Sequence, residues 1–164
     1  EEVAFIMGLV ARNLRDQYDF YRDNRIKLYH SGNVDQLPPE VRSEIEAVTE
    51  DTKEYDRIRV NLAVNYGGRN EITRAVNRWL QEEGPQAWID EEAIAAHLDL
   101  PAFPDPDLII RTGGEKRISN FLLWESAYAE LYFSQRLWPD WDKEELVEAV
   151  KDFARRKRNF GGMR

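Results

Sequence analysis

Two short runs of apolar and β-branched residues, each followed closely by a pair of glycines, constrain this chain most. The first run, RVNLAVNY, covers residues 59–66 and ends at Gly67–Gly68; the second, DLIIR, covers residues 107–111 and leads to Gly113–Gly114. Such runs are typical of buried strands, and glycines allow the tight turns that follow them. Because ligands gather at the carboxyl ends of strands in layered α/β sheets, both turns are candidate binding segments.

Helical patterns, with apolar residues three or four apart, alternate with these runs. Helices are predicted over Glu1–Asn24, Glu40–Tyr55, Ile72–Leu80 (ending at Gly84), Asp90–His97 and Asp142–Arg158, the last with Leu146, Val150 and Phe153 facing inward. Strands are predicted over Arg25–Gly32, Arg59–Tyr66, Asp107–Arg111 and Glu130–Phe133. The segment over Pro101–Pro106 is predicted to be irregular. Strands that alternate with helices pair in parallel, since each crossover returns the chain to the same direction. The predicted fold class is α/β, a mostly parallel sheet flanked by helices, in a single domain over residues 1–164.

The chain is acidic, and this excludes some partners. It has 164 residues and a net charge of −8, with 42% hydrophobic and 33% charged residues. Broad attraction to nucleic acid or to an anionic membrane requires a surplus of Lys and Arg on the contact surface. We therefore expect no nucleic-acid partner, and any phosphate-bearing ligand must meet a local cationic cluster.

The sequence contains no cysteine, which removes disulfides, thiolate nucleophiles and cysteine-bound zinc. No apolar run approaches the roughly 20 residues that cross a bilayer, and no signal-peptide pattern opens the chain. We expect a soluble protein in the cytoplasm.

A cationic segment follows the second strand. Residues 111–119 read RTGGEKRIS and place Arg111, Arg117 and Ser119 around the two glycines. Guanidinium groups bind phosphate oxygens in a fork, and glycines let the backbone approach an anion closely. The segment predicts a diphosphate cradle, although a solvated turn with charges for solubility accounts equally well for the same residues.

Glu130 lies between two apolar neighbours, Ala129 and Leu131. An unpaired carboxylate in such a setting is costly, so either an arginine or a divalent metal should accompany it. Pairing with arginine is the commoner outcome in proteins.

Other features favour a structural interpretation. NYGGR at residues 65–69 places Arg69 at the start of a helix, where anions bind, but a double-glycine turn is more often a steric solution. The basic tail over Arg155–Arg164 matches a helix C-terminus with a glycine stop.

His30 and His97 lie far apart in sequence and receive no catalytic role. The following aromatic residues suit a core, a subunit interface or a pocket wall: Trp124, Tyr128, Tyr132, Phe133, Trp138 and Trp141.

Together these segments resemble a known family. NLAVNYGGRNEI at residues 61–72, DLIIRTGGEKRISNFLLWESAYAELYF at 107–133, LWPDW at 137–141 and NFGG at 159–162 occur in the order and spacing of undecaprenyl diphosphate synthase and its cis-prenyltransferase relatives. The opening helix and the loop HSGNVDQLPPEV also lie where that family places them, so the resemblance covers essentially the whole chain.

The resemblance implies a homodimeric α/β enzyme that uses Mg²⁺ to add isopentenyl diphosphate units to an allylic diphosphate such as farnesyl diphosphate. The product would be a polyprenyl diphosphate such as undecaprenyl diphosphate. On this basis Arg111, Arg117 and Ser119 bind the diphosphate of isopentenyl diphosphate, and Glu130 is a magnesium ligand contributed across the dimer. The C-terminal tail would reach the partner's site, and the lipid product could bring the enzyme to a membrane surface.

The resemblance also implies residues outside this sequence. The family begins with a strand leading to a DGNGRW segment, whose aspartate binds metal and is essential; we expect it to precede Glu1, together with strands from the middle of the sheet. The 164 residues would then be the C-terminal two-thirds of the fold and carry no catalytic residue of their own. Lys116 stands where some members have a metal-binding histidine and receives no metal role, and Asn159 replaces an arginine common before the terminal phenylalanine. A non-catalytic partner subunit, an inactive truncated form and a phosphate-binding scaffold are the alternatives.

Overall fold

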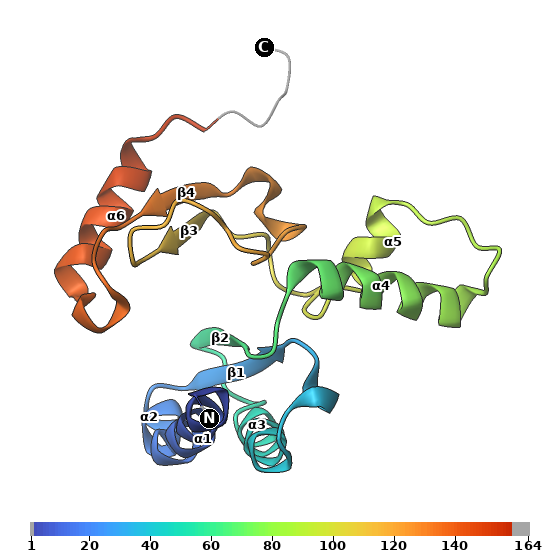
Figure 1. Ribbon diagram of the computed structural model, residues 1–164, viewed down its shortest axis with the longest axis horizontal. Helices are drawn as coiled ribbons and strands as arrows, with labels where there is room; N and C mark the ends of the chain where they lie inside the picture. Colours follow the sequence, from blue (N-terminus) through green and yellow to red (C-terminus); the bar gives the residue numbers. More distant parts are fainter. Residues whose placement is uncertain (1, 159–164) are drawn as a thin grey trace. The chain divides into compact units, whose positions relative to one another are not determined.

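The computed structural model describes residues 2–158, which fall into two compact units divided between Leu100 and Pro101 (Figure 1). Each unit contains one pair of parallel strands together with helices. The parallel pairing predicted from the alternation of strands and helices is confirmed, and so is the α/β fold class. That residues 1–164 form a single domain stays a prediction.

The first unit follows the predicted order of elements closely. It consists of α1 (Glu2–Asp16), α2 (Tyr18–Asp23), β1 (Ile26–Ser31), the 3₁₀ helix η1 (Val34–Gln36), α3 (Pro39–Asp51), β2 (Ile58–Ala63), α4 (Gly68–Glu83) and α5 (Glu91–Ala96). The single helix predicted over residues 1–24 is divided at Gln17. Asp90 caps α5, because its side chain accepts a hydrogen bond from the amide of Ala93 at 2.8 Å.

The core of this unit lies between the strand pair and the helices α1 and α3, which cover one face of it (Figure 1). β1 and β2 run in register from Ile26 opposite Ile58 to Ser31 opposite Ala63. The buried apolar residues come from both helices, from β1 and from the connection before α3: Ala11, Leu14, Ile26, Leu28, Leu37, Val41, Ile45 and Val48. The regular apolar stripe predicted for α3 is therefore the part of the core that this helix supplies.

Thr52 joins the end of α3 to β1. Its hydroxyl donates to the Val48 carbonyl at 2.7 Å and accepts from the Leu28 amide at 3.0 Å. The side chain is fully buried. A threonine side chain, rather than a neighbouring strand, thus satisfies a buried amide of β1.

Asp99 joins the carboxyl end of β1 to α4. Its carboxylate accepts hydrogen bonds from Arg74 at 2.5 and 2.6 Å, from Arg78 at 3.1 Å and from the Gly32 amide at 2.8 Å. Burial alone would raise the pKa of Asp99, but the hydrogen bonds, that from Arg74 first, outweigh it and lower the pKa below its usual value. Asp99 therefore stays ionised near neutral pH and holds the turn after β1 close to α4.

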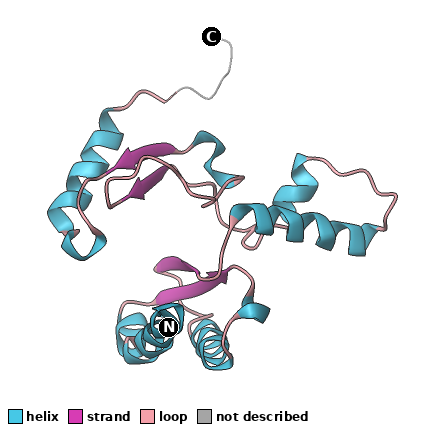
Figure 2. Cartoon of the chain, in the orientation of Figure 1, coloured by secondary structure: helices cyan, strands magenta, loops and turns pink. Residues whose placement is uncertain are grey.

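The second unit contains β3 (Leu108–Arg111), the 3₁₀ helix η2 (Glu125–Tyr128), β4 (Glu130–Phe133), the 3₁₀ helix η3 (Trp138–Asp140) and α6 (Lys143–Arg155). Leu108 lies opposite Glu130, and Arg111 lies opposite Phe133. The chain between the two strands is mostly loop, with η2 as its short helical part (Figure 2). No helix in residues 2–158 has the length and apolar character of a membrane-spanning segment.

The buried stripe of α6 is rotated from the predicted one. Ala149 is fully buried, whereas Leu146 and Val150, which were predicted to face inward, are 46% and 50% exposed. Glu145 and Asp152 lie about one turn before and after Ala149, and each forms an ion pair with an arginine. The prediction for Leu146 and Val150 was wrong because apolar spacing does not reveal polar side chains that are paired.

Replacing Thr52 with valine tests the link between α3 and β1. We expect Thr52→Val to lower the free energy of unfolding by about 1–3 kcal/mol, because the Leu28 amide stays buried without its acceptor. Thr49→Val is the matched control, since the Thr49 hydroxyl donates only to carbonyls of its own helix. Urea unfolding measures both variants, and equal losses would contradict the assignment.

Candidate functional site

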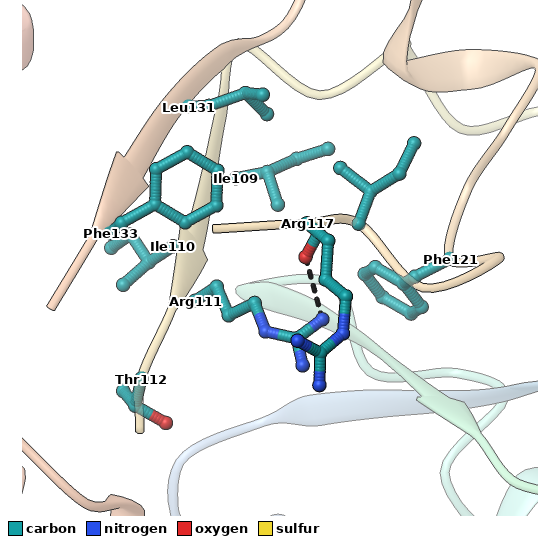
Figure 3. Close-up of a pocket in the computed structure, with 9 residues that line it drawn as sticks. Ile109, Ile110, Arg111, Thr112, Arg117, Phe121, Leu131 and Phe133 are labelled. Carbon is teal, nitrogen blue, oxygen red and sulfur yellow. Dashed lines mark hydrogen bonds between the residues drawn. The ribbon is translucent and has the colours of Figure 1, made fainter. Parts of the chain in front are cut away.

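The turn after β3 folds back onto the last residue of that strand. Arg111 Nη1 donates to the Arg117 carbonyl at 2.6 Å and to Ser119 Oγ at 2.8 Å. Arg111 and Arg117 line the same pocket (Figure 3). Ser119 has a left-handed backbone conformation, with φ of 48°, which costs energy in a residue other than glycine. The structure thus brings together the three residues predicted to bind a diphosphate.

Gly113 and Gly114 shape this turn and anchor it. Both have positive φ, 93° and 88°. Their amides donate to the Arg136 carbonyl at 2.7 Å and to the Ser134 carbonyl at 2.9 Å, in the chain that follows β4. The sequence suggested that these glycines would let the backbone approach an anion, but their amides are used within the fold. The amides of Gly113 and Gly114 are therefore not available to an anion.

A carboxylate of the same turn lies near both guanidinium groups. Glu115 Oε2 is 3.5 Å from Arg111 Nη2, and Glu115 Oε1 is 3.6 Å from Arg117 Nη2. Two neighbouring cations repel each other, and a carboxylate near both reduces that repulsion, as an anionic ligand would. The sequence analysis gave Glu115 no role, although its spacing of four residues from Arg111 and two from Arg117 was a usable signal.

An apolar pocket of about 330 Å³ lies beside these arginines. Its walls include the side chains of Ile109, Ile110, Phe121, Leu131 and Phe133, and both Arg111 and Arg117 also line it (Figure 3). A ligand that matches such a lining carries a small apolar group joined to an anion. Of the aromatic residues after the turn, Phe133 lines this pocket, whereas Tyr128 and Trp138 are 65% and 73% exposed.

Glu130 lies at the other end of the strand pair. It stands opposite Leu108, the first residue of β3, whereas Arg111 is the last. At a rise of about 3.3 Å per residue, the backbone positions of Glu130 and Arg111 are roughly 10 Å apart along the strands. Glu130 Oε2 accepts a hydrogen bond from Arg156 Nη1 at 2.7 Å. Of the two partners that the sequence predicted for this carboxylate, an arginine or a metal ion, the structure thus shows an arginine. Within one chain, the register does not bring Glu130 to the arginine turn.

Comparison with known proteins identifies the family. The sequence model of one family, described as "Putative undecaprenyl diphosphate synthase", matches residues 1–161. This chain belongs to that prenyltransferase family.

Curated relatives of this prenyltransferase carry the name isoprenyl transferase. The chain is 47% identical over 160 residues to the protein of Treponema denticola, covering 98% of this chain and 70% of that protein. It is 44% identical over 165 residues to the protein of Thermotoga maritima, with 99% and 71% covered. The resemblance drawn from the motifs is confirmed, and the chain is an enzyme of the prenyl-transferring class.

Two solved structures share its fold. The crystal structure of a "probable undecaprenyl diphosphate synthase" from Campylobacter jejuni matches with a TM-score of 0.89 at 40% identity and covers 98% of this chain and 75% of that one. Lavandulyl diphosphate synthase from Lavandula x intermedia, in complex with dimethylallyl diphosphate, matches with a TM-score of 0.91 at 30% identity, covering 98% and 72%. The α/β fold of this prenyltransferase is therefore the cis-prenyltransferase fold.

The oxygen donors of this prenyltransferase suit a magnesium ion only in part. Mg²⁺ commonly takes one or two carboxylates and completes its shell with substrate phosphates and water. Within residues 2–158, no three His, Asp or Glu side chains gather into a metal cage. Glu130 offers one carboxylate, in which Oε2 is held by Arg156, and no hydrogen bond within the described residues uses Oε1. This donor fits an ion whose remaining ligands are phosphate oxygens and water.

Gly32, which follows β1, meets a steric limit, whereas the steric interpretation of the Gly67–Gly68 turn stays a prediction. The Asn33 amide donates to the Asn65 carbonyl at 3.0 Å, and the Asn65 side-chain amide donates to the Asn33 carbonyl at 2.8 Å. A Cβ on Gly32 would lie 2.2 Å from the Val64 carbonyl oxygen, so only glycine allows the ends of β1 and β2 to approach this closely. Asn159 and the NFGG segment lie outside the described residues.

Replacing Glu115 with glutamine tests whether its carboxylate occupies the position that a diphosphate would take between Arg111 and Arg117. We expect Glu115→Gln to bind inorganic pyrophosphate more tightly, by about fivefold or less, because an exposed carboxylate no longer competes for the two arginines. Isothermal titration calorimetry without metal measures the dissociation constant. Glu145→Gln is the matched control, since Glu145 pairs with Arg136, which does not line the pocket. Weaker binding by Glu115→Gln would mean that Glu115 helps to bind the ligand.

Proposed function

We propose that this prenyltransferase condenses isopentenyl diphosphate with an allylic diphosphate, such as farnesyl diphosphate, and makes a polyprenyl diphosphate such as undecaprenyl diphosphate. The observation that carries the proposal is that Arg111 and Arg117 both line one apolar pocket and both lie within 3.6 Å of the Glu115 carboxylate (Figure 3). Isopentenyl diphosphate has the two parts that this lining requires, a diphosphate and a short branched hydrocarbon. The proposal thus explains why a cationic turn and apolar walls occur together in an acidic chain.

Each residue of the turn has a distinct role in this proposal. Arg111 and Arg117 bind the diphosphate oxygens of isopentenyl diphosphate, because guanidinium groups offer paired N–H donors to phosphate. Ser119 orients Arg111 through its Oγ, which lies 2.8 Å from Arg111 Nη1. Binding of the diphosphate displaces Glu115 from its place near both arginines.

The allylic substrate is proposed from a neighbour of the same fold. Lavandulyl diphosphate synthase was crystallised with dimethylallyl diphosphate, which is itself an allylic diphosphate. Its similarity to this chain supports an isoprenoid diphosphate as the second substrate here. Farnesyl diphosphate is the primer that we propose for a product of undecaprenyl length.

Glu130 is proposed as the magnesium ligand of this chain. When bound, Mg²⁺ would neutralise negative charge that develops on the departing diphosphate. Glu130 and Arg111 lie at opposite ends of the strand pair. In this proposal, the Glu130 carboxylate and the arginine turn of the same chain therefore belong to two different active sites. We therefore propose a homodimer in which Glu130 acts in the site of the partner subunit.

The proposal includes a cytoplasmic location. A cysteine-free chain has no need of an oxidising compartment, and the net charge of −8 does not favour an anionic membrane surface. Contact with a membrane would come through the lipid product.

Chain elongation by the purified protein tests the proposal. With labelled isopentenyl diphosphate, farnesyl diphosphate and Mg²⁺, we expect polyprenyl diphosphates longer than the primer. Arg117→Ala should lower kcat/KM for isopentenyl diphosphate by about 10- to 100-fold, because a charge-assisted hydrogen bond to the diphosphate is lost.

Arg136→Ala is the matched control for this assay. Arg136 belongs to the same unit and pairs with Glu145 at 2.8 Å, but it does not line the pocket. We expect its kcat/KM to stay within about twofold of the wild-type value. If the wild-type chain elongates no primer, the alternatives of a non-catalytic partner subunit and of an inactive truncated form gain support; if Arg117→Ala elongates normally, the binding role of the turn is wrong.

A further inference from the structure

Arg156 holds Glu130 more firmly than an ordinary surface ion pair would. Its Nη1 donates to Glu130 Oε2 at 2.7 Å and to the Leu131 carbonyl at 3.1 Å. Its Nε and Nη2 donate to Asp152 Oδ2 at 2.9 and 2.6 Å. All of these partners lie in the second unit, and the side chains of Arg156 and Glu130 are only 28% and 29% exposed. Because its guanidinium group donates hydrogen bonds to both Glu130 and Asp152, the Arg156 side chain is held in one conformation.

Asp152 also balances the charge of Arg156. Asp152 and Glu130 each carry one negative charge, and Asp152 lies near both Arg156 and Arg155, whose Nη2 is 3.8 Å from Asp152 Oδ1. An arginine next to Glu130 without a second carboxylate would neutralise it and repel a cation. With Asp152 present, Arg156 can orient Glu130 without leaving an uncompensated positive charge beside it.

The two oxygens of Glu130 are used differently. Oε2 accepts the hydrogen bond from Arg156, whereas no hydrogen bond within residues 2–158 uses Oε1. Carboxylates that bind metal ions are commonly held in place by hydrogen bonds from a neighbouring group, and removing that group typically lowers metal affinity 10- to 100-fold. A carboxylate fixed at one oxygen and open at the other is prepared for such a role.

We propose that Arg156 is a positioning residue for the metal ligand: it holds Glu130 through Oε2 and leaves Oε1 for a divalent cation. This inference rests on the proposed role of Glu130 as a magnesium ligand. The opposite hypothesis is that Arg156 competes with the cation for the carboxylate. The two differ in the sign of the effect, because loss of a positioning residue weakens cation binding and loss of a competitor strengthens it.

Paramagnetic line broadening measures this sign without recourse to catalysis. Mn²⁺ alone is titrated into the ¹⁵N-labelled full chain, and the broadening of the Glu130 and Leu131 amide signals gives the Mn²⁺ concentration at half effect. We expect Arg156→Gln to raise that concentration about tenfold or more. Arg156→Lys keeps the charge and one donor, and should recover part of the loss. An unchanged or lower concentration for Arg156→Gln would overturn the proposal.

Arg158→Gln is the matched control. Arg158 is two residues away, forms an ion pair with Asp107 and donates to the Tyr128 carbonyl, so its loss removes a nearby positive charge without touching Glu130. We expect the Mn²⁺ concentration at half effect to be no higher in this variant than in the wild-type chain. Weakening equal to that of Arg156→Gln would mean a general loss of structure and would overturn the inference.

Two further variants separate the possible failures. Glu130→Gln should abolish the broadening; if it does not, the proposed role of Glu130 as a metal ligand is wrong, whatever Arg156 does. If Glu130→Gln abolishes it and Arg156→Gln does not weaken it, only the positioning role fails. Should Arg156→Gln not fold, as judged from its amide spectrum, Asp152→Asn takes its place, and an unchanged Mn²⁺ effect there would also overturn the inference.

Discussion

The parallel register of β3 and β4 decides what the second unit can do. Pairing Leu108 with Glu130 and Arg111 with Phe133 puts the arginine turn at one end of the strands and the carboxylate at the other. A slip of one residue would exchange the faces of the side chains on the slipped strand, Phe133 and Leu131 of the pocket wall included. The apolar pocket, the separation of Arg111 from Glu130 and the contact of Glu130 with Arg156 all depend on this short ladder.

Charges in this protein are held in place by opposite charges. In an acidic chain, phosphate recognition needs a local cationic cluster, and the structure concentrates one where β3 ends. Glu115 lies near both arginines of that cluster, while Asp152 offsets Arg156 beside Glu130. In the first unit, the carboxylate of Asp99 offsets the positive charge of Arg74. Such pairs reduce the repulsion between neighbouring like charges.

Periodicity in the sequence predicted the elements well, and its failures have physical causes. Every predicted strand is present in residues 2–158, and in three of the four a glycine at or soon after the end of the apolar run marks the strand end. The predicted helix over residues 1–24 is divided at Gln17, which no proline or glycine marks. The inward stripe predicted for α6 was wrong at Leu146 and Val150, since apolar spacing does not show that Glu145 pairs with Arg136 and Asp152 with Arg156.

By itself, the sequence determined the family, the strand-and-helix order and the grouping of Arg111, Arg117 and Ser119, because these depend on local spacing and on motifs that are contiguous in the chain. Only the tertiary structure decided that the turn glycines donate their amides to the chain after β4, and that the partner of Glu130 is Arg156. These contacts join residues roughly 20 or more positions apart. Strand register and helix packing bring them together, and neither is written in the spacing of residues along one segment.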